Sequence, residues 1–121
     1  MFQGEVNQSE NLLRFAFRGH VTTEETARWR AELGGFLKQL QPGFKLLSDF
    51  SGVESIDFAC APDIEIVMEM LGKAGIAKVV RIIADPRQDI GMNIMSRFHY
   101  HRRVKIVTCE TMEEALKALM D

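Results

Sequence analysis

The chain has 121 residues, of which 46% are hydrophobic and 26% charged, and this composition is typical of one globular domain of ordinary size. Its net charge of −2 argues against a nucleic-acid-binding protein, because general attraction to phosphates needs a basic excess. No run approaches the roughly 20 apolar residues of a membrane span, and the first residues do not resemble a signal peptide. We therefore expect a single domain over residues 1–121, located in the cytoplasm.

The two cysteines, Cys60 and Cys109, are far apart and have no neighbours at metal-ligand spacing. They do not form a disulfide framework, and a cytoplasmic protein would keep them as reduced thiols. The sequence thus predicts neither a metal site nor a cofactor.

Residues 2–7 and 12–18 are short strand candidates joined by a polar turn, which indicates an antiparallel hairpin. A helix should follow, because Thr22 and Glu25 have the spacing of a capping box. Pro42-Gly43 should end this helix. Its apolar residues recur at helical spacing: Trp29, Leu33, Phe36, Leu37 and Leu40.

The apolar residues 44–49 predict a buried strand that ends at Asp49, followed by a polar loop at 51–61. That loop is longer than the connection of about 2–6 residues that an α/β unit needs, so it is a candidate site. Pro62 suits the first turn of a second helix, with Ile64, Val67, Met68 and Leu71 as its core stripe.

Residues 78–84 and 104–107 are the last two strand candidates, and a helix between them begins at Asp85-Pro86. A second capping box, Thr111 with Glu114, opens a C-terminal helix packed through Ala115, Leu116 and Leu119. Strands that alternate with helices imply parallel pairing. The predicted fold class is α/β: a single-layer mixed sheet of about five strands, one of them antiparallel, with about four helices.

Ligands of open α/β sheets bind beyond the carboxyl ends of the strands. In this sequence those ends carry Asp49, Asp57 and Asp85, although Asp85 is also well placed to cap a helix. Asp49 and Asp57 could act as acid and base. However, no Ser, His or Lys completes a nucleophilic set, and glycine-rich phosphate-binding motifs are absent. We therefore expect no enzymatic activity.

The second helix has a wider apolar arc than a surface helix needs, because Ile66 and Met70 extend it beyond the core stripe. Either neighbouring helices cover these two residues or a partner does, and Met suits adaptable contact surfaces. We expect Ile66 and Met70 to be more solvent-accessible than the core stripe. A basic run at residues 97–105 lies near a predicted helix end, where the dipole favours cations; an anionic partner is the alternative.

The segment FKLLSDFSGVESIDFACAPDIEIVMEML, residues 44–71, resembles the central motif of STAS domains, the module of anti-sigma-factor antagonists and sulfate transporters. In that motif an apolar strand ends in Asp, and a Ser-Gly-Val-like turn leads to Asp-Ser-Ser-Gly at the start of a helix. The order of elements extends the resemblance over nearly the whole chain. It is most similar to the divergent STAS-like branch that is also compared with lipid-binding SEC14 domains.

The resemblance implies a binding function without the usual switch. In antagonists of that family, phosphorylation of the second Ser of the motif controls binding to a kinase anti-sigma factor. Aligned on Ser51-Gly52-Val53 and Asp57, this position is Ala59, between Phe58 and Cys60. Alanine has no hydroxyl, so a phosphate charge cannot be added there.

The sequence therefore predicts a non-enzymatic STAS-like module that binds a protein partner, with a second copy of the chain as one candidate. The alternative is a carrier or sensor of a small apolar or anionic ligand at the carboxyl edge of the sheet. An enzyme using Asp49 and Asp57 is the third and weakest hypothesis. The candidate binding residues are Asp49, Asp57, Phe58, Ala59, Cys60, Ile66, Met70 and Asp85.

Overall fold

The structure, a computed structural model, describes residues 1–84, 100 and 103–121. Its five strands form one sheet in the order β1-β2-β3-β4-β5. The first pair is antiparallel and the other three pairs are parallel, which confirms the predicted mixed sheet. The strands are β1 (Phe2–Asn7), β2 (Leu12–Val21), β3 (Lys45–Ile56), β4 (Lys78–Ile82) and β5 (Lys105–Cys109).

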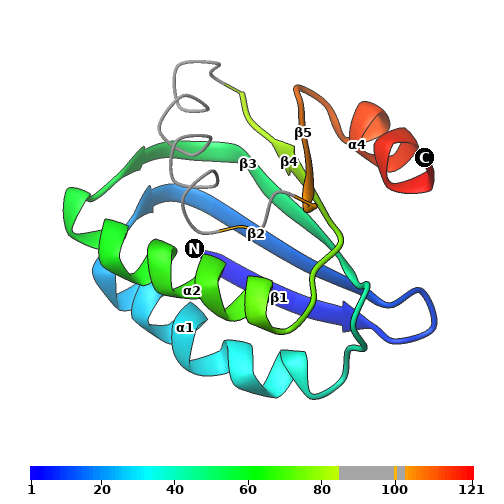
Figure 1. The fold of residues 1–121 in the computed structure, drawn as a ribbon. Helices are drawn as coiled ribbons and strands as arrows, with labels where there is room; N and C mark the ends of the chain where they lie inside the picture. The colour runs from blue at the N-terminus through cyan, green and yellow to red at the C-terminus, as the bar shows by residue number, and fades with distance from the viewer. Residues whose placement is uncertain (85–99, 101–102) are drawn as a thin grey trace.

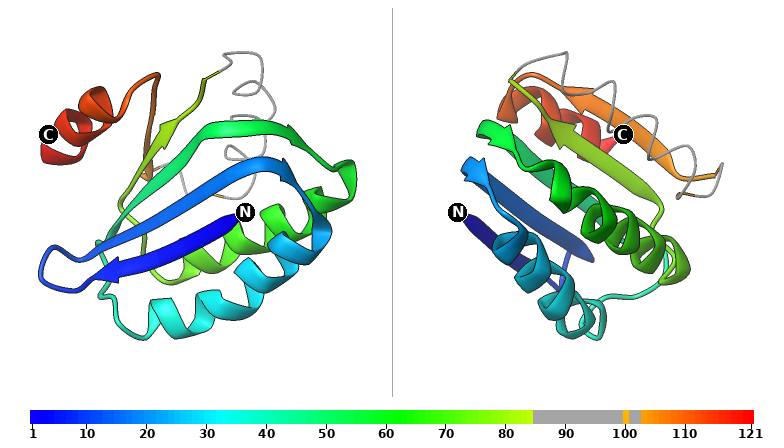
Figure 2. Two further views of the ribbon diagram at one scale, coloured as in Figure 1. Left: turned by 180° about the vertical axis from the view of Figure 1, so that it is seen from behind. Right: turned by 90° about the vertical axis from the view of Figure 1, so that its left-hand side faces the viewer.

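Helices cover both faces of this sheet (Figures 1 and 2). On one face lie α1 (Thr23–Leu37) and α2 (Ala61–Lys73), and α4 (Met112–Met120) lies on the other. Four helices were expected, and the described residues contain three. Asp85 and the helix predicted after it lie outside the described residues, as does most of the basic run. No helix in the described ranges is long and apolar enough to cross a membrane.

Both predicted capping boxes are confirmed. The backbone N–H of Glu25 donates to the hydroxyl of Thr22 at 3.3 Å, and that of Glu114 donates to Thr111 at 3.2 Å. Each bond satisfies one of the amide groups that a helix start leaves without a partner. The two boxes therefore fix where α1 and α4 begin.

β3 is longer than predicted, and the expectation that it ends at Asp49 was wrong. The strand continues to Ile56 because it keeps pairing with β2, whose Val21 is the register partner of Ile56. Two irregularities in the register insert extra residues into β3, which bends a strand without ending it. At the first, the carboxylate of Asp49 accepts bonds from the backbone N–H and the hydroxyl of Ser51, at 2.9 and 2.6 Å. The segment 51–56 is thus a bulged strand rather than a loop.

The main core lies between the sheet and helices α1 and α2. Aromatic rings dominate it: Trp29 of α1 meets Phe15 and Phe17 edge-on at 5.2 and 5.0 Å, and Phe17 stacks on Phe50 at 5.6 Å. Such pairs add about 0.5–1.5 kcal/mol each beyond the area they bury. They hold β2 and β3 against α1.

The core under α4 is smaller, and α4 packs mainly on β3, β4 and β5. Its buried contact is Ala115, whereas Leu116 is 49% exposed, so the expectation that Leu116 packs inward was wrong. The C-terminal end of α4 is held by lysines: Lys45 and Lys78 donate to the carbonyl oxygens of Leu119 and Ala118. Burial, with the nearby charges of Lys105 and Lys45, lowers the pKa of Lys78. Among the described residues, no helix covers the β1 and β2 half of this sheet face.

Candidate functional site

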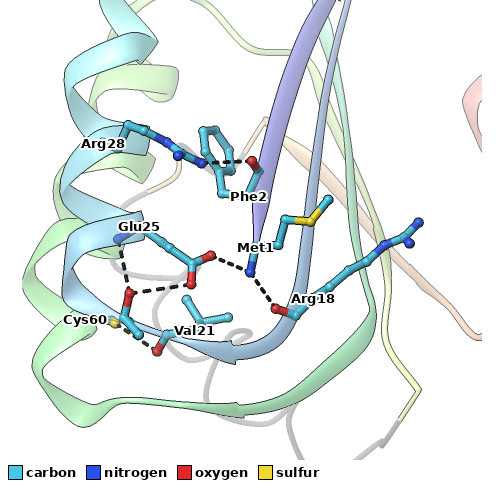
Figure 3. Close-up of polar contacts among 8 residues, drawn as sticks. Met1, Phe2, Arg18, Val21, Glu25, Arg28 and Cys60 are labelled. Atoms are coloured by element: carbon cyan, nitrogen blue, oxygen red, sulfur yellow. Dashed lines mark hydrogen bonds and ion pairs between the residues drawn. The ribbon is translucent and has the colours of Figure 1, made fainter.

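The starts of α1 and of the segment before α2 lie side by side at the carboxyl ends of β2 and β3. Three residues, Phe58–Cys60, form a short 3-10 helix, η1, between β3 and α2. The backbone N–H of Asp57 donates to the carbonyl oxygen of Val21 at 3.0 Å. The thiol of Cys60 lies 3.7 Å from the same oxygen (Figure 3). The last residue of β2 thus anchors the connection between β3 and α2.

η1 presents an apolar residue to solvent. Asp57 caps it, since the backbone N–H of Ala59 donates to the Asp57 carboxylate at 2.9 Å. Cys60 points into the core and is fully buried, whereas Phe58 is 98% exposed and Ala59 is also exposed. In a turn of this tight helix the inward position taken by Cys60 leaves its neighbours facing outward. Burying a Phe side chain is worth about 1.5–3 kcal/mol, and the isolated chain does not gain that energy.

Further along α2, Ile66 and Met70 line a shallow groove against α1. Both residues are half-buried, whereas the four core-stripe residues Ile64, Val67, Met68 and Leu71 are buried, which confirms the expected difference in accessibility. The groove is open to solvent and has a volume of about 470 Å³. Ala27 and Ala31 of α1 form its opposite wall.

A polar cluster closes the end of this groove nearest to η1. The carboxylate of Asp63 accepts from the hydroxyl of Thr26 at 3.1 Å and from the guanidinium of Arg30 at 3.3 Å. The Asp63–Arg30 ion pair joins the first turn of α2 to α1. Sequence reasoning missed Arg30 and the two alanines, because nothing in the sequence indicated which face of α1 would meet α2.

Asp49 does not join Asp57. It lies within β3 and lines a cleft of about 540 Å³ on the sheet face that carries α4, together with Arg14, Arg18 and Met112. Asp57 lies at the end of the strand beside η1. The two carboxylates that could have acted as acid and base are therefore not brought together, and Asp85 lies outside the described residues.

The interior at the carboxyl ends of β2 and β3 is filled by side chains. The void among Phe17, Val21, Trp29, Ile56 and Ile64 measures about 10 Å³. That is at most the space of one water molecule. This part of the interior therefore has no room for a small ligand.

The start of α1 is closed by polar contacts (Figure 3). The α-amino group of Met1 lies 2.7 Å from the carboxylate of Glu25 and donates to the carbonyl oxygen of Arg18 at 2.7 Å. Arg28 donates to the carbonyl oxygen of Phe2 at 2.9 Å. The hydrogen bond from the amino group holds the pKa of Glu25 below its ordinary value of 4.5, against the opposing effect of burial. Glu25 therefore serves both the capping box and the chain terminus.

Comparisons with known proteins show which solved structures share this fold. No protein-family model and no curated protein sequence matches the chain. Among solved structures, a DUF3478-family protein from Shewanella loihica, described as having a SpoIIAA-like fold, is 19% identical with a TM-score of 0.75, over 98% of this chain and 93% of that one. The chain has a SpoIIAA-like, that is STAS-like, fold. This confirms the fold that the motif at residues 44–71 predicted.

Two anti-sigma-factor antagonists share the STAS-like fold. SpoIIAA in its unphosphorylated form is 15% identical with a TM-score of 0.67, over 99% of this chain and 98% of that one. The structure of SpoIIAA from Bacillus is also known in its phosphorylated form. An antagonist from Mycobacterium paratuberculosis is 19% identical with a TM-score of 0.62, over 100% and 96% of the two chains. At these identities the likeness shows the fold alone.

Proposed function

We propose that this chain is a non-enzymatic STAS-like module that binds a protein partner through its η1–α2 surface. This surface is defined as Asp57, Phe58, Ala59, Ile66 and Met70. Structural neighbours that are anti-sigma-factor antagonists support a role in protein interaction. Cys60 and Asp49 are not part of the surface, since the first is buried beneath it and the second lies on the other face of the sheet.

The exposure of Phe58 is the observation that carries the proposal. A large apolar side chain that is 98% exposed gains nothing in the isolated chain. Aromatic residues at the centre of an interface commonly supply much of the binding energy. Phe58 is also held in place, because the Asp57 cap and the buried Cys60 fix η1 on either side of it. The backbone at Phe58 therefore loses little conformational entropy when a partner binds.

The second part of the proposal is that Ala59 removes control by phosphorylation at this position. Ala59 is exposed at the start of the η1–α2 segment, where a hydroxyl would be accessible to a kinase. Peptide mapping of the protein from its own cells should find residues 57–61 without phosphate while the partner stays bound. Phosphate on Ser55 together with loss of the partner would contradict this part of the proposal.

The alternative function, a carrier or sensor of a small ligand, is less well supported. The interior at the carboxyl edge holds only about 10 Å³. The cleft of about 540 Å³ has the size of a ligand site. However, it lies on an open sheet face and includes the charged residues Glu5, Arg14, Arg18 and Asp49. A small ligand bound there would stay open to solvent.

Affinity capture tests the protein-binding proposal. The wild-type chain, Phe58→Asp and the control Gln8→Asp, which changes an exposed turn residue between β1 and β2, are each incubated with extract of the cells that produce the protein. A partner retained by the wild type and the control but lost by Phe58→Asp is the expected result. If Phe58→Asp is folded and retains the same proteins, the proposal is wrong.

A further inference from the structure

The outer side of α4 carries a stripe of exposed apolar side chains. Met112, Leu116 and Met120 are 37, 49 and 85% exposed, and they recur every four residues, so they lie along one side of the helix. The other large exposed apolar residues of the described chain are Met1 and Phe58. A line of three such residues on a helix of nine is the pattern of a helix face that packs against something.

The sheet beside α4 is uncovered. Alternate residues of β1 and β2 point to the α4 side, and they include Gln3, Glu5, Arg14, Ala16 and Arg18, all exposed or half-buried. These five residues, named here the open sheet face, form half of the lining of the cleft of about 540 Å³. Met112 lines the same cleft, so the stripe of α4 and the open sheet face are continuous.

The projecting helix α4 and the uncovered half of the sheet face have complementary shapes. α4 stands above one half of the sheet face, over β3, β4 and β5, and no described helix covers the other half (Figure 2). When two copies meet face to face about a two-fold axis, the α4 of each lies over the bare half of the other. A two-fold contact uses the same patch on both copies, which requires that patch to carry both the projecting and the receiving part.

The charges agree with the shape. The start of α4 is acidic, with Glu110, Glu113 and Glu114 all exposed. The open sheet face offers the guanidinium of Arg18, which is exposed, points away from the Met1 cluster (Figure 3) and has no ion-pair partner among the described residues. Arg14 lies 3.7 Å from Glu5. In the face-to-face pair the acidic turn of one copy therefore meets a basic group of the other.

We propose that the chain forms a homodimer in which the α4 stripe of each copy packs on the open sheet face of the other. The dimer uses a different face from the η1–α2 surface, so a partner protein and a second copy bind at the same time. The bare face spans about 10 Å across the two strands β1 and β2 and about 20 Å along them, and α4 adds a ridge about 13 Å long. That is at the lower end of specific interfaces, so the dimer is reversible.

Sedimentation velocity over a micromolar concentration series tests the dimer. The wild type should show a reversible monomer–dimer equilibrium. Met120→Lys and Arg18→Glu should each weaken it by about tenfold or more, because the first replaces an apolar side chain of the α4 stripe with a charged one and the second repels the acidic turn. Phe58→Asp, on the other face of the sheet, is the matched control and should leave it unchanged. Thermal melts confirm that all four proteins are folded.

A wild type that stays monomeric throughout the series, or variants that dimerise as well as the wild type, would overturn the proposal. Cross-linking identifies the arrangement. In a mixture of Leu116→Cys and Ala16→Cys chains, a short bis-maleimide should join one of each. Cross-links only between two Leu116→Cys chains would show that α4 packs on α4 instead, and would contradict the assignment of the open sheet face.

Discussion

The starts of α1 and α2 follow neighbouring parallel strands, yet one is closed and the other is open. At α1, the N–H of Glu25 donates to the hydroxyl of Thr22, and the carboxylate of Glu25 pairs with the α-amino group of Met1. At η1, which leads into α2, Asp57 supplies a cap, but the next two residues, Phe58 and Ala59, lie in solvent. The chain thus stabilises the first start with its own groups and leaves an apolar surface at the second.

This difference separates stability from binding. Polar contacts that close within the chain contribute to folding, whereas an exposed aromatic residue contributes only when something covers it. Substitutions at the start of α1 should therefore change stability, and those on the η1–α2 surface should change binding. The buried residue beneath that surface, Cys60, belongs to the first class although it is next to Ala59 in sequence.

The largest effect is expected at Cys60. Cys60→Asp places a carboxylate in a fully buried position of the hydrophobic core, which should cost about 3 kcal/mol or more of unfolding free energy. Ala59→Asp, one residue earlier and exposed, is the matched control and should stay within about 0.5 kcal/mol. Chemical denaturation of the two variants measures the contrast, and equal losses would show that η1 does not sit as described.

Glu25→Gln should have the next largest effect, about 1 kcal/mol, because it weakens both the cap and the ion pair with the α-amino group. Glu24→Gln is the control, since Glu24 is exposed in the same first turn. Because the pKa of Glu25 is lowered on folding, its carboxylate stabilises the protein above its unfolded pKa, about 4.3. That contribution disappears as the pH falls through the folded value.

Melting temperatures of the two Glu variants at a series of pH values test this linkage. The difference in melting temperature between the wild type and Glu25→Gln should be full near about pH 7. It should vanish towards about pH 2, where the Glu25 carboxyl is protonated in both the folded and the unfolded state. A difference that does not change with pH would mean that the charge of Glu25 contributes nothing.

Asp57→Ala should cost less, about 0.5–1 kcal/mol, because it removes a single exposed cap bond to the N–H of Ala59. Urea denaturation would detect it. The same substitution should weaken partner binding, since it releases the turn that holds Phe58. Binding that is unaffected by Asp57→Ala would indicate that η1 need not be fixed.

Phe58→Asp should have the smallest effect on stability, within about 0.5 kcal/mol, because the side chain is almost fully exposed. A differential melt of the two proteins measures it. A clear drop in melting temperature would mean that Phe58 packs within the chain, and the contrast between the two helix starts would then be lost.

Sequence patterns predicted the elements whose signals are local. The Thr22–Glu25 and Thr111–Glu114 boxes marked two helix starts correctly. The second half of β3 was missed because residues 51–56, SGVESI, lack apolar alternation, and the strand is held by pairing with β2 across two bulges. Helical spacing predicted a buried Leu116, but burial depends on what α4 packs against, and α4 covers only half of its sheet face.

The candidate site was predicted only in part for the same reason. The arc on α2 correctly set Ile66 and Met70 apart from the buried stripe. No local pattern could show that Cys60 turns inward while Phe58 turns outward, since both are apolar residues in one short turn. The separation of Asp49 from Asp57 follows from the length of β3, which depends on contacts distant in sequence.

Site-specific photo-cross-linking in the cells that produce the protein tests the central claim most directly. A benzophenone amino acid replaces Phe58 in one version and Gln8, an exposed turn residue at the other end of the strands, in the other. We predict a discrete protein adduct from position 58 and none from position 8. If position 58 gives no adduct beyond that seen at position 8, the η1–α2 surface is not where this protein meets its partner.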